Sequence, residues 1–323
     1  MIPMKLRPLE FEKPILELEE KLADLKKHSR ANDMNFDSEV HRMEAKIDET
    51  KRVIYENLTP WQRVQIARHA ARPFALDYIQ LSFTNFLEIH GDRLFGEDRA
   101  MPGGFATMDD HRCVVIGHQK GRDLKENLKR NFGSANPEGY RKALRLMRLA
   151  EKFGLSFVSL IDTPGAYPGV GAEERHISEA IAVNLREMMV LKTPIVAVVI
   201  GEGGSGGALG IAVADRVLML EHSYYSVISP EGCAAILWKH RKHAPEAAAA
   251  LKLTAGDLLD MKLIDGVIPE PLGGAHRNHT AAIANLKSAV RRQLDELRAI
   301  PIEELLKQRY EKFRRVGEFV EEG

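Results

Sequence analysis

The sequence predicts an α/β fold in which buried strands lead through glycine-rich loops into helices. The first observation is the segment 194–215, where the apolar run 195–200 precedes five glycines between positions 201 and 207 and an apolar helix over 208–214. Continuous β-branched runs are typical of strands that are covered on both faces. The second observation is the buried strand over 157–161, which leads through the loop 162–171 into another helix. Two such units form a pseudo-repeat, as expected of a spiral of strands and helices.

The first 75 residues predict a helical hairpin that precedes this α/β core. Apolar side chains recur at helical spacing in two stretches, on either side of the polar segment 29–38. They are Ile15, Leu18, Leu22 and Leu25 in the first stretch, and Val40, Met43, Ile47 and Ile54 in the second. A hairpin of this length is too narrow to form a domain alone, so we expect its apolar seam to pack on the core or on another subunit. The region 1–75 is therefore predicted to contribute an interface.

Between the hairpin and the core, the patterns predict a linker with a short helix over 59–74. The region 76–271 is expected to form the core. Its patterns predict a helix over 76–89, a polar loop over 91–104, strands over 216–220 and 225–228, and a helix that opens at Ser229. Pro230 directly after this serine is typical of a helix N-terminus.

Residues 272–323 are expected to complete the same domain. The turn 272–279 contains a glycine pair and the histidines His276 and His279, for which surface or capping roles are expected. Residues 278–320 predict two charged amphipathic helices, broken at Pro301. One face of the first helix carries Leu286, Val290, Leu294 and Leu297. This face is expected to cover the core or an interface.

The glycine loop that follows Ile200 predicts an anion site made of backbone amides. The first amides of a helix have no intrahelical acceptors, so they can point at a negatively charged oxygen. The donors expected here are the amides of Gly206, Gly207 and Ala208. No lysine follows these glycines, so a phosphate cradle of the P-loop kind is not predicted.

A hydrolase is a competing interpretation of the same loop. Ser205 lies in the run GGSGG, which satisfies the GxSxG pattern of a nucleophile elbow, although a glycine-rich run satisfies it easily by chance. Its partners would be Asp215 or Asp265 and a histidine such as His222 or His276. A third possibility is a structural subunit that only organises a complex.

Composition argues against several other classes of protein. The formal net charge is zero, so nothing general indicates nucleic-acid binding. The basic clusters 120–130 and 141–148 are expected to be solvated helix faces or to meet an acidic partner or coenzyme phosphates. Cys113 and Cys233 are the only cysteines, which argues against a disulfide framework or a zinc site and indicates a reducing, cytoplasmic location. No apolar run approaches the ~20 residues that span a bilayer.

The order of strand, glycine loop, helix and two further strands resembles the crotonase superfamily. Enzymes of that superfamily have a β-β-α spiral and bind thioester enolates through two backbone amides. Leu209 stands where hydratases of the superfamily commonly carry a catalytic glutamate. This departure argues against hydration.

Six longer motifs resemble the α-subunit family of the bacterial acetyl-coenzyme A carboxylase carboxyltransferase. They are DTPGAYPGVGAEER, IGEGGSGGALG, YSVISPEGCAAILW, IPEPLGGAHR, NPEGYRKALRLM and IGHQKGR. Several long motifs in the right order identify a family better than any single glycine loop. The resemblance implies a crotonase-like core with an N-terminal hairpin and C-terminal helices.

The resemblance also implies a reaction and a set of partners. Carboxybiotin on a separate carrier protein would give its carboxyl group to acetyl-coenzyme A, which forms malonyl-coenzyme A in the first committed step of fatty acid biosynthesis. A β subunit that bears a zinc finger would complete the cleft in an α2β2 assembly, and a biotin carboxylase would belong to the same enzyme system. No metal is expected in this chain.

The site residues implied by the resemblance lie in the two glycine loops. The amides of Gly206, Gly207 and Ala208 would hold the ureido oxygen of biotin as negative charge develops there. The residues expected to contact substrate are Gly165, Ala166, Gly169, Gly203, Gly204 and Ser205.

Overall fold

An eight-stranded sheet forms the centre of the computed structural model, which describes residues 8–32 and 36–317. The strand order is β1-β2-β3-β4-β5-β6-β8, and β7 pairs with the end of β5. The pairs β1/β2 and β2/β3 are antiparallel, and the remaining pairs are parallel. The strands are β1 (Thr84–Glu88), β2 (Gly103–Met108), β3 (His111–Gly117), β4 (Ser156–Thr163), β5 (Ile195–Gly204), β6 (Arg216–Leu220), β7 (Tyr224–Ser226) and β8 (Gly266–Ile268).

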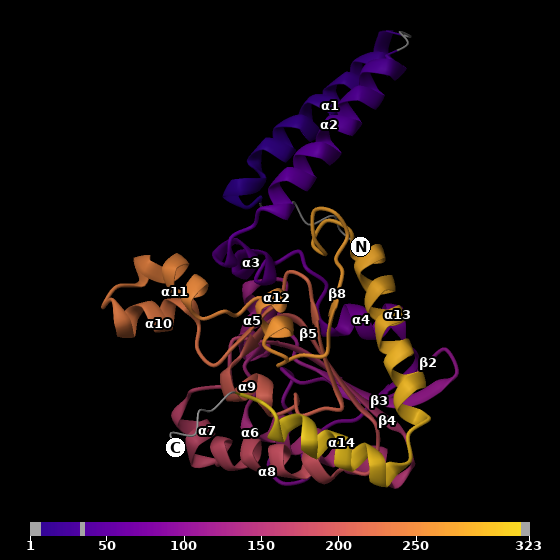
Figure 1. Cartoon of the computed structure of the whole chain (residues 1–323), viewed down its shortest axis with the longest axis vertical. Helices are drawn as coiled ribbons and strands as arrows, with labels where there is room; N and C mark the ends of the chain where they lie inside the picture. The colour runs from indigo at the N-terminus through magenta and orange to yellow at the C-terminus, as the bar shows by residue number, and fades with distance from the viewer. Residues whose placement is uncertain (1–7, 33–35, 318–323) are drawn as a thin grey trace, which may run out of the picture.

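Helices cover both faces of this sheet (Figure 1). One face packs on α6 and α8, and the other packs on α4 and α13. The helices are α1 (Lys13–Asn32), α2 (Asp37–Glu56), α3 (Pro60–Ala67), α4 (Ala75–Ser82), α5 (Leu124–Lys129), α6 (Pro137–Lys152), α7 (Val170–Glu174), α8 (Ile177–Val190), α9 (Ser205–Leu209), α10 (Pro230–Leu237), α11 (Ala244–Ala250), α12 (Ala255–Asp260), α13 (His279–Arg298) and α14 (Ile302–Arg314). Among the described helices, none is both long and apolar enough to cross a membrane.

The two central strands confirm the prediction made from their apolar runs. Every residue of β4 and of β5 is buried, as expected for strands with helices on both sides. However, β5 continues through Gly204, and the helix that follows is α9 rather than a helix over 208–214. Two of the glycines are therefore ladder residues, because Gly203 pairs with both Thr163 and Tyr225, and Gly204 pairs with Ser226.

The prediction of one helix over 76–89 is wrong in its second half. The helix α4 ends at Ser82, and β1 follows it. β1 pairs with β2, and β2 in turn forms an antiparallel pair with β3. The amphipathic pattern of this short segment did not distinguish a helix from an edge strand, because the strand is defined by its partner.

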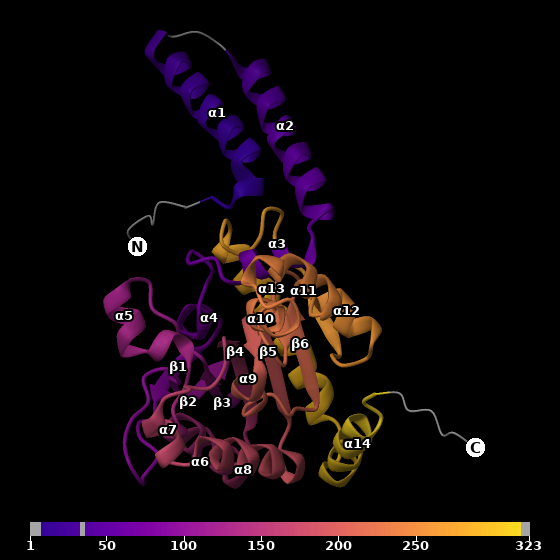
Figure 2. The same ribbon diagram turned by 90° about the vertical axis from the view of Figure 1, so that its left-hand side faces the viewer.

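The N-terminal hairpin projects from the body as two antiparallel helices, α1 and α2 (Figures 1 and 2). Its apolar seam was expected to pack on the core or on another subunit, and contact with another subunit stays a prediction. Ile15 and Ile47 are buried against each other's helices in a cluster that includes Tyr55, Leu58 and Ile66. The seam therefore packs inside the hairpin and on α3.

Buried polar contacts fix the base of the hairpin to the C-terminal part of the chain. Glu12 Oε1 accepts hydrogen bonds from the Tyr55 hydroxyl (2.9 Å) and from Arg277 Nε (3.0 Å), and it lies 3.0 Å from His276 Nε2. Burial alone would raise the pKa of Glu12, but His276, Arg277 and the Leu9 amide hold it well below the usual value. His276 is thus buried, not at the surface as expected.

The C-terminal helices confirm their prediction. α13 and α14 are separated near Pro301, and the four apolar residues of the predicted face of α13 are fully buried on the sheet. The predicted extension to residue 320 lies partly outside the described residues.

Candidate functional site

Two glycine loops, which follow β4 and β5, meet at the carboxyl ends of these strands. A Cβ atom on Gly207 would lie 2.3 Å from the Ala166 amide nitrogen, and one on Gly204 would lie 2.2 Å from the Pro164 carbonyl oxygen. Real Cβ atoms do not approach other atoms so closely. Glycine at positions 204 and 207 is therefore what allows the β4 loop to contact β5 and α9.

Hydrogen bonds distinguish the amides of the β4 loop. The Gly165 amide donates to the Thr163 hydroxyl (3.1 Å), and that hydroxyl donates to the Gly165 carbonyl oxygen (2.8 Å). The Tyr167 amide donates to the Ala135 carbonyl oxygen (3.0 Å). The amide of Ala166 has no acceptor among the described residues, and Ala166 is half-buried. Ala166 therefore provides a free donor next to α9, whereas the Gly165 amide is engaged.

Accessibility distinguishes the amides of α9. Gly206 is half-buried, and a Cβ atom there would be 3.9 Å from the nearest side chain, Ile181. Gly207 is buried, and Ala208 has no exposed surface. Gly206 is therefore the most exposed of the three residues expected from the sequence to donate. α9 has only five residues, so its dipole adds little to the donors themselves.

The remaining glycines of the expected substrate-binding set have structural roles. Gly203 and Gly204 are buried in β5, and their amides face the ladder rather than solvent. Gly169 is the N-cap of α7. A Cβ atom at this position would lie 2.4 Å from the ring of Tyr167, so a larger residue would clash there. These three glycines thus have packing roles in the fold, and their contact with substrate stays a prediction.

Ser205 has the backbone of a nucleophile elbow without the catalytic partners. Its φ of 52° lies in the left-handed region, and its side chain is exposed. The partners considered from the sequence are engaged elsewhere: Asp215 with Arg309, Asp265 with Lys312, His222 with Arg63 and His276 with Glu12. None of these four groups hydrogen-bonds to Ser205 in the described part of the chain. The structure does not assemble a hydrolase triad.

We therefore expect Ser205→Ala to keep turnover within about threefold of the wild type, because the amide at this position is unchanged and its hydroxyl has no hydrogen-bond partner among the described residues. The carboxyltransferase rate of the complex with a β subunit measures this, with a fluorophosphonate probe as the control for nucleophilic serine. A loss above about a hundredfold, as for a missing nucleophile, would instead support the hydrolase interpretation.

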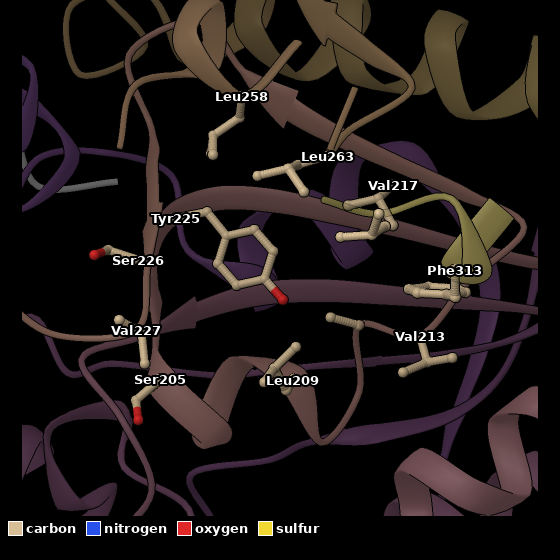
Figure 3. A pocket seen from close by; sticks show the side chains of 12 residues that line it. Ser205, Leu209, Val213, Val217, Tyr225, Ser226, Val227, Leu258, Leu263 and Phe313 are labelled. Atoms are coloured by element: carbon tan, nitrogen blue, oxygen red, sulfur yellow. The ribbon is translucent and has the colours of Figure 1, made fainter. Parts of the chain in front are cut away.

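An apolar pocket of about 340 Å³ lies on the other side of α9 (Figure 3). Tyr225 lies at the centre of its lining, and burial raises the pKa of this phenol, which stays protonated at neutral pH. Ser205 and Leu209 of α9 form one wall, and Phe313 of α14 closes another. The lining contains no charged residue. The pocket thus suits an apolar part of a ligand.

The described residues offer two groups of side chains that are close enough to share a metal ion. The first is Glu12, His69 and His276. Here the carboxylate oxygen already bonds to the cationic Arg277, which opposes a second cation. The second group is at the surface and consists of Glu88, His90 and Glu97. Neither group lies in the glycine loops.

The two basic clusters are less exposed than the sequence predicts. Lys120 contacts the buried carboxylates of Asp162 and Glu202, and Arg141 donates to the buried Asp92 (2.8 Å). Sequence reasoning therefore missed a charged network directly behind the glycine loops. The only signal for it was the presence of Lys120 in the motif IGHQKGR.

A sheet of mainly parallel strands whose two central strands lead into glycine loops has a fold of the crotonase-like class. Solved structures share this fold. The 12S transcarboxylase with methylmalonyl-coenzyme A and methylmalonic acid bound is 18% identical over 71% of this chain and 43% of its own, with a TM-score of 0.58. A Pseudomonas malonate decarboxylase hetero-tetramer in complex with coenzyme A is 15% identical over 67% of this chain and 86% of its own, with a TM-score of 0.54.

Sequence comparison establishes the family. Residues 8–317 match the family described as acetyl co-enzyme A carboxylase carboxyltransferase-like, and the chain belongs to this family. The acetyl-coenzyme A carboxylase carboxyl transferase subunit alpha of Geobacter metallireducens is 57% identical over 97% of this chain and 98% of its own length. The protein of the same name from Thermus thermophilus is 54% identical over 97% of this chain and 99% of its own.

Proposed function

We propose that this chain is the part of a carboxyltransferase that receives carboxybiotin and holds the ureido oxygen of biotin. The acceptor is acetyl-coenzyme A and the product is malonyl-coenzyme A. The proposal rests on the amide of Ala166, which has no acceptor among the described residues and lies next to α9. Gly206 is the partly exposed residue at the start of that helix. Near-identical length and high identity to proteins named as α subunits support the choice of reaction.

The chemistry asks for hydrogen-bond donors rather than for a catalytic side chain. Carboxybiotin is a substrate here, and loss of its carboxyl group places negative charge on the ureido oxygen. The amides of Ala166 and Gly206 would donate to that oxygen and stabilise the charge as it develops. Each preorganised donor of this kind contributes on the order of 10² to 10³ in rate. The released biotin anion can take the proton from the acetyl group, so no further base is required of this chain.

The neighbouring surface fits an incomplete cleft. Around the two loops, large apolar side chains are exposed: Tyr167 and Val170 of the β4 loop, Leu209 of α9, and Val227 after β7. Exposed apolar groups that surround a site indicate that a second protein covers it. We infer that a β subunit, which would carry the zinc finger and hold the thioester, docks here in an α2β2 assembly. A biotin carboxyl carrier protein and a biotin carboxylase would be the other partners.

The same proposal places the protein in the cytoplasm. Cys113 and Cys233 are both free and buried, as is usual for chains that stay in a reducing compartment. Neither a membrane nor a nucleic acid is needed for the reaction.

Reconstitution tests the proposed function. We expect the purified chain alone to have no carboxyltransferase activity, because it supplies one of two sets of donors, and activity to appear on addition of a β subunit from a relative. The assay is the reverse reaction of malonyl-coenzyme A with a free biotin derivative, which needs no carboxylase. Substantial turnover by this chain alone, or no turnover by the mixture, would contradict the proposal.

A further inference from the structure

A buried ammonium group joins the two strands that carry the glycine loops. Lys120 Nζ donates to Asp162 Oδ1 on β4 (2.6 Å) and to Glu202 Oε1 on β5 (2.7 Å). The side chains of the two acids are 4% and 8% exposed, and that of Lys120 is 14% exposed. Lys120 itself follows β3, so its side chain reaches across the ends of two neighbouring strands.

The two carboxylates lie directly before the proposed donors. Ala166 is the fourth residue after Asp162 along the chain, and Gly206 is the fourth residue after Glu202. The Glu202 amide also donates to Asp162 Oδ1 (2.9 Å). The same oxygen thus bonds to Lys120 and to the backbone of β5. A displacement of Asp162 or Glu202 would therefore also displace the loop that follows it, because the connecting segments are short.

The β-ladder is irregular where Lys120 acts. Ile161 pairs with Val199, but the next pair joins Thr163 to Gly203. Over this interval β4 advances by two residues and β5 by four, which is a bulge in β5. The β4–β5 ladder is therefore interrupted at Asp162 and Glu202, and it resumes at Thr163 and Gly203, directly before the loops. Across the interruption, side chains bond to the backbone of β5, since the Ile200 carbonyl oxygen accepts from Arg72 (2.9 Å) and the Glu202 amide bonds to Asp162.

Glycine is required beside the bridge for steric reasons. A Cβ atom on Gly201 would lie 2.5 Å from Asp162 Oδ1, and one on Gly133 would lie 2.8 Å from Lys120 Cγ. The bridge is thus enclosed by backbone on two sides. Its geometry is built into the fold and is not a chance surface contact.

The other groups that face the bridge do not titrate near neutral pH. Glu202 Oε2 accepts from Arg68 (2.7 Å) and from the Tyr224 hydroxyl (2.6 Å), and Arg68 also pairs with Glu231 of α10. Burial alone would raise the pKa of Glu202, but Lys120 and Arg68 hold it at about 2. Burial raises the pKa of Tyr224.

The groups on the adjoining elements behave in the same way. Burial, together with the charge of Lys120, lowers the pKa of His118 to about 3. Glu270, which pairs with Arg72, would have its pKa raised by burial, yet Arg72 and His222 hold it at about 2. Glu202, His118 and Glu270, whose pKa values lie far below neutral pH, therefore keep the same charge between pH 6 and pH 8 in the wild type.

We propose that Lys120 is a positioning residue whose bridge from Asp162 to Glu202 sets the spacing of the two loops, so that the Ala166 and Gly206 amides converge on one oxygen. This inference rests on the proposed function. Without the ammonium group, two buried carboxylates would repel each other across the bulge, and the loops would move apart. Misplacement by about 1 Å can cost on the order of 10² in rate without a comparable loss of binding.

Lys120→Met in the complex with the β subunit tests the proposal, with Lys125→Met on the exposed face of α5 as the matched control. We expect kcat of the reverse reaction to fall about tenfold to a hundredfold and the KM for malonyl-coenzyme A to stay within about threefold. The control should keep both constants.

The pH dependence distinguishes positioning from general loss of structure. Lys120 is one of the two cations that lower the pKa of Glu202, so its removal should raise that pKa. A proton shared by Asp162 and Glu202 would bridge them in place of Lys120. The kcat of Lys120→Met relative to the wild type should therefore rise as the pH falls from 8 to 6. A ratio that does not change with pH, or kcat within twofold of the wild type, would overturn the proposal.

A second variant tests the proposal if Lys120→Met does not fold or assemble. Asp162→Asn keeps an acceptor for the Glu202 amide but removes the charge on which Lys120 acts. It should lower kcat several-fold with little change in KM, and unchanged kcat would overturn the proposal. A wild-type complex without turnover would instead refute the proposed function, so the two failures are distinguishable.

Discussion

Gly206→Pro is expected to lower the kcat of the complex by about 10²- to 10³-fold, the loss of a single oxyanion donor. Proline removes the amide hydrogen and keeps a helical φ, and it is tolerated in the first turn of a helix. Space is available, since a Cβ atom at this position would be 3.9 Å from the nearest atoms, those of Ile181. Steady-state kinetics of the reverse reaction measure the effect, with the KM for malonyl-coenzyme A changed less than kcat.

The structure narrows the choice of donor to be tested. Proline at 207 would collide with the amide nitrogen of Ala166, and Ala208 has no exposed surface through which a donor could act. Gly206→Ala is the matched control, because it adds a side-chain atom and retains the amide. It should stay within about threefold of the wild type.

Ser205 precedes the new proline and needs its own control. Its left-handed φ of 52° is a strained conformation for serine, and proline further restricts the residue before it. The substitution should therefore also be made in a Ser205→Gly background. If the folded Gly206→Pro complex turned over normally in both backgrounds, the amide mechanism would have to be abandoned. A subunit that only organises the complex would then be the better interpretation.

Arg309→Met is expected to destabilise the chain by about 3–5 kcal/mol, the effect of breaking a buried ion pair from one side. Arg309 donates to both carboxylate oxygens of Asp215 (2.8 Å each), and its remaining donors reach the carbonyl oxygens of Met188, Leu191 and Thr193. The side chains of the pair are 0% and 2% exposed. Methionine would leave the Asp215 charge buried with no cation.

Urea denaturation of this chain measures the loss of stability. Arg292→Met is the matched control, since Arg292 is 72% exposed and its ion pair with Glu296 is long, at 4.0 Å. This control should change the free energy of unfolding by less than about 0.5 kcal/mol. Asp215→Asn added to Arg309→Met should recover part of the loss, because it removes the unpaired charge. A loss below about 1 kcal/mol for Arg309→Met would show that α14 is not held by this pair.

The local sequence predicted the elements whose burial is continuous or periodic. The apolar runs over 157–161 and 195–200 identified β4 and β5, and the four-residue face of α13 is buried as expected. Such patterns report which side of an element meets the core. The long motifs also predicted the family that the comparisons establish.

The same patterns could not show which residues far apart in the chain contact each other. β1 was predicted as helix because its identity as a strand depends on β2. The hairpin seam was predicted to pack on the core or on another subunit, and within the chain it packs inside the hairpin and on α3. Arg309 lies in a helix that the sequence predicts to be charged and amphipathic, yet its side chain is fully buried in an ion pair with Asp215.

For the candidate site, the sequence determined which segments are glycine-rich, and tertiary structure decided what each glycine does. Gly203, Gly204 and Gly207 allow close packing, whereas Gly206 is left accessible. Only the folded chain shows that Thr163 engages the Gly165 amide and leaves that of Ala166 free. The physical reason is that glycine spacing fixes where backbone can approach backbone, but a free donor is defined by the absence of an acceptor, which depends on the whole surroundings.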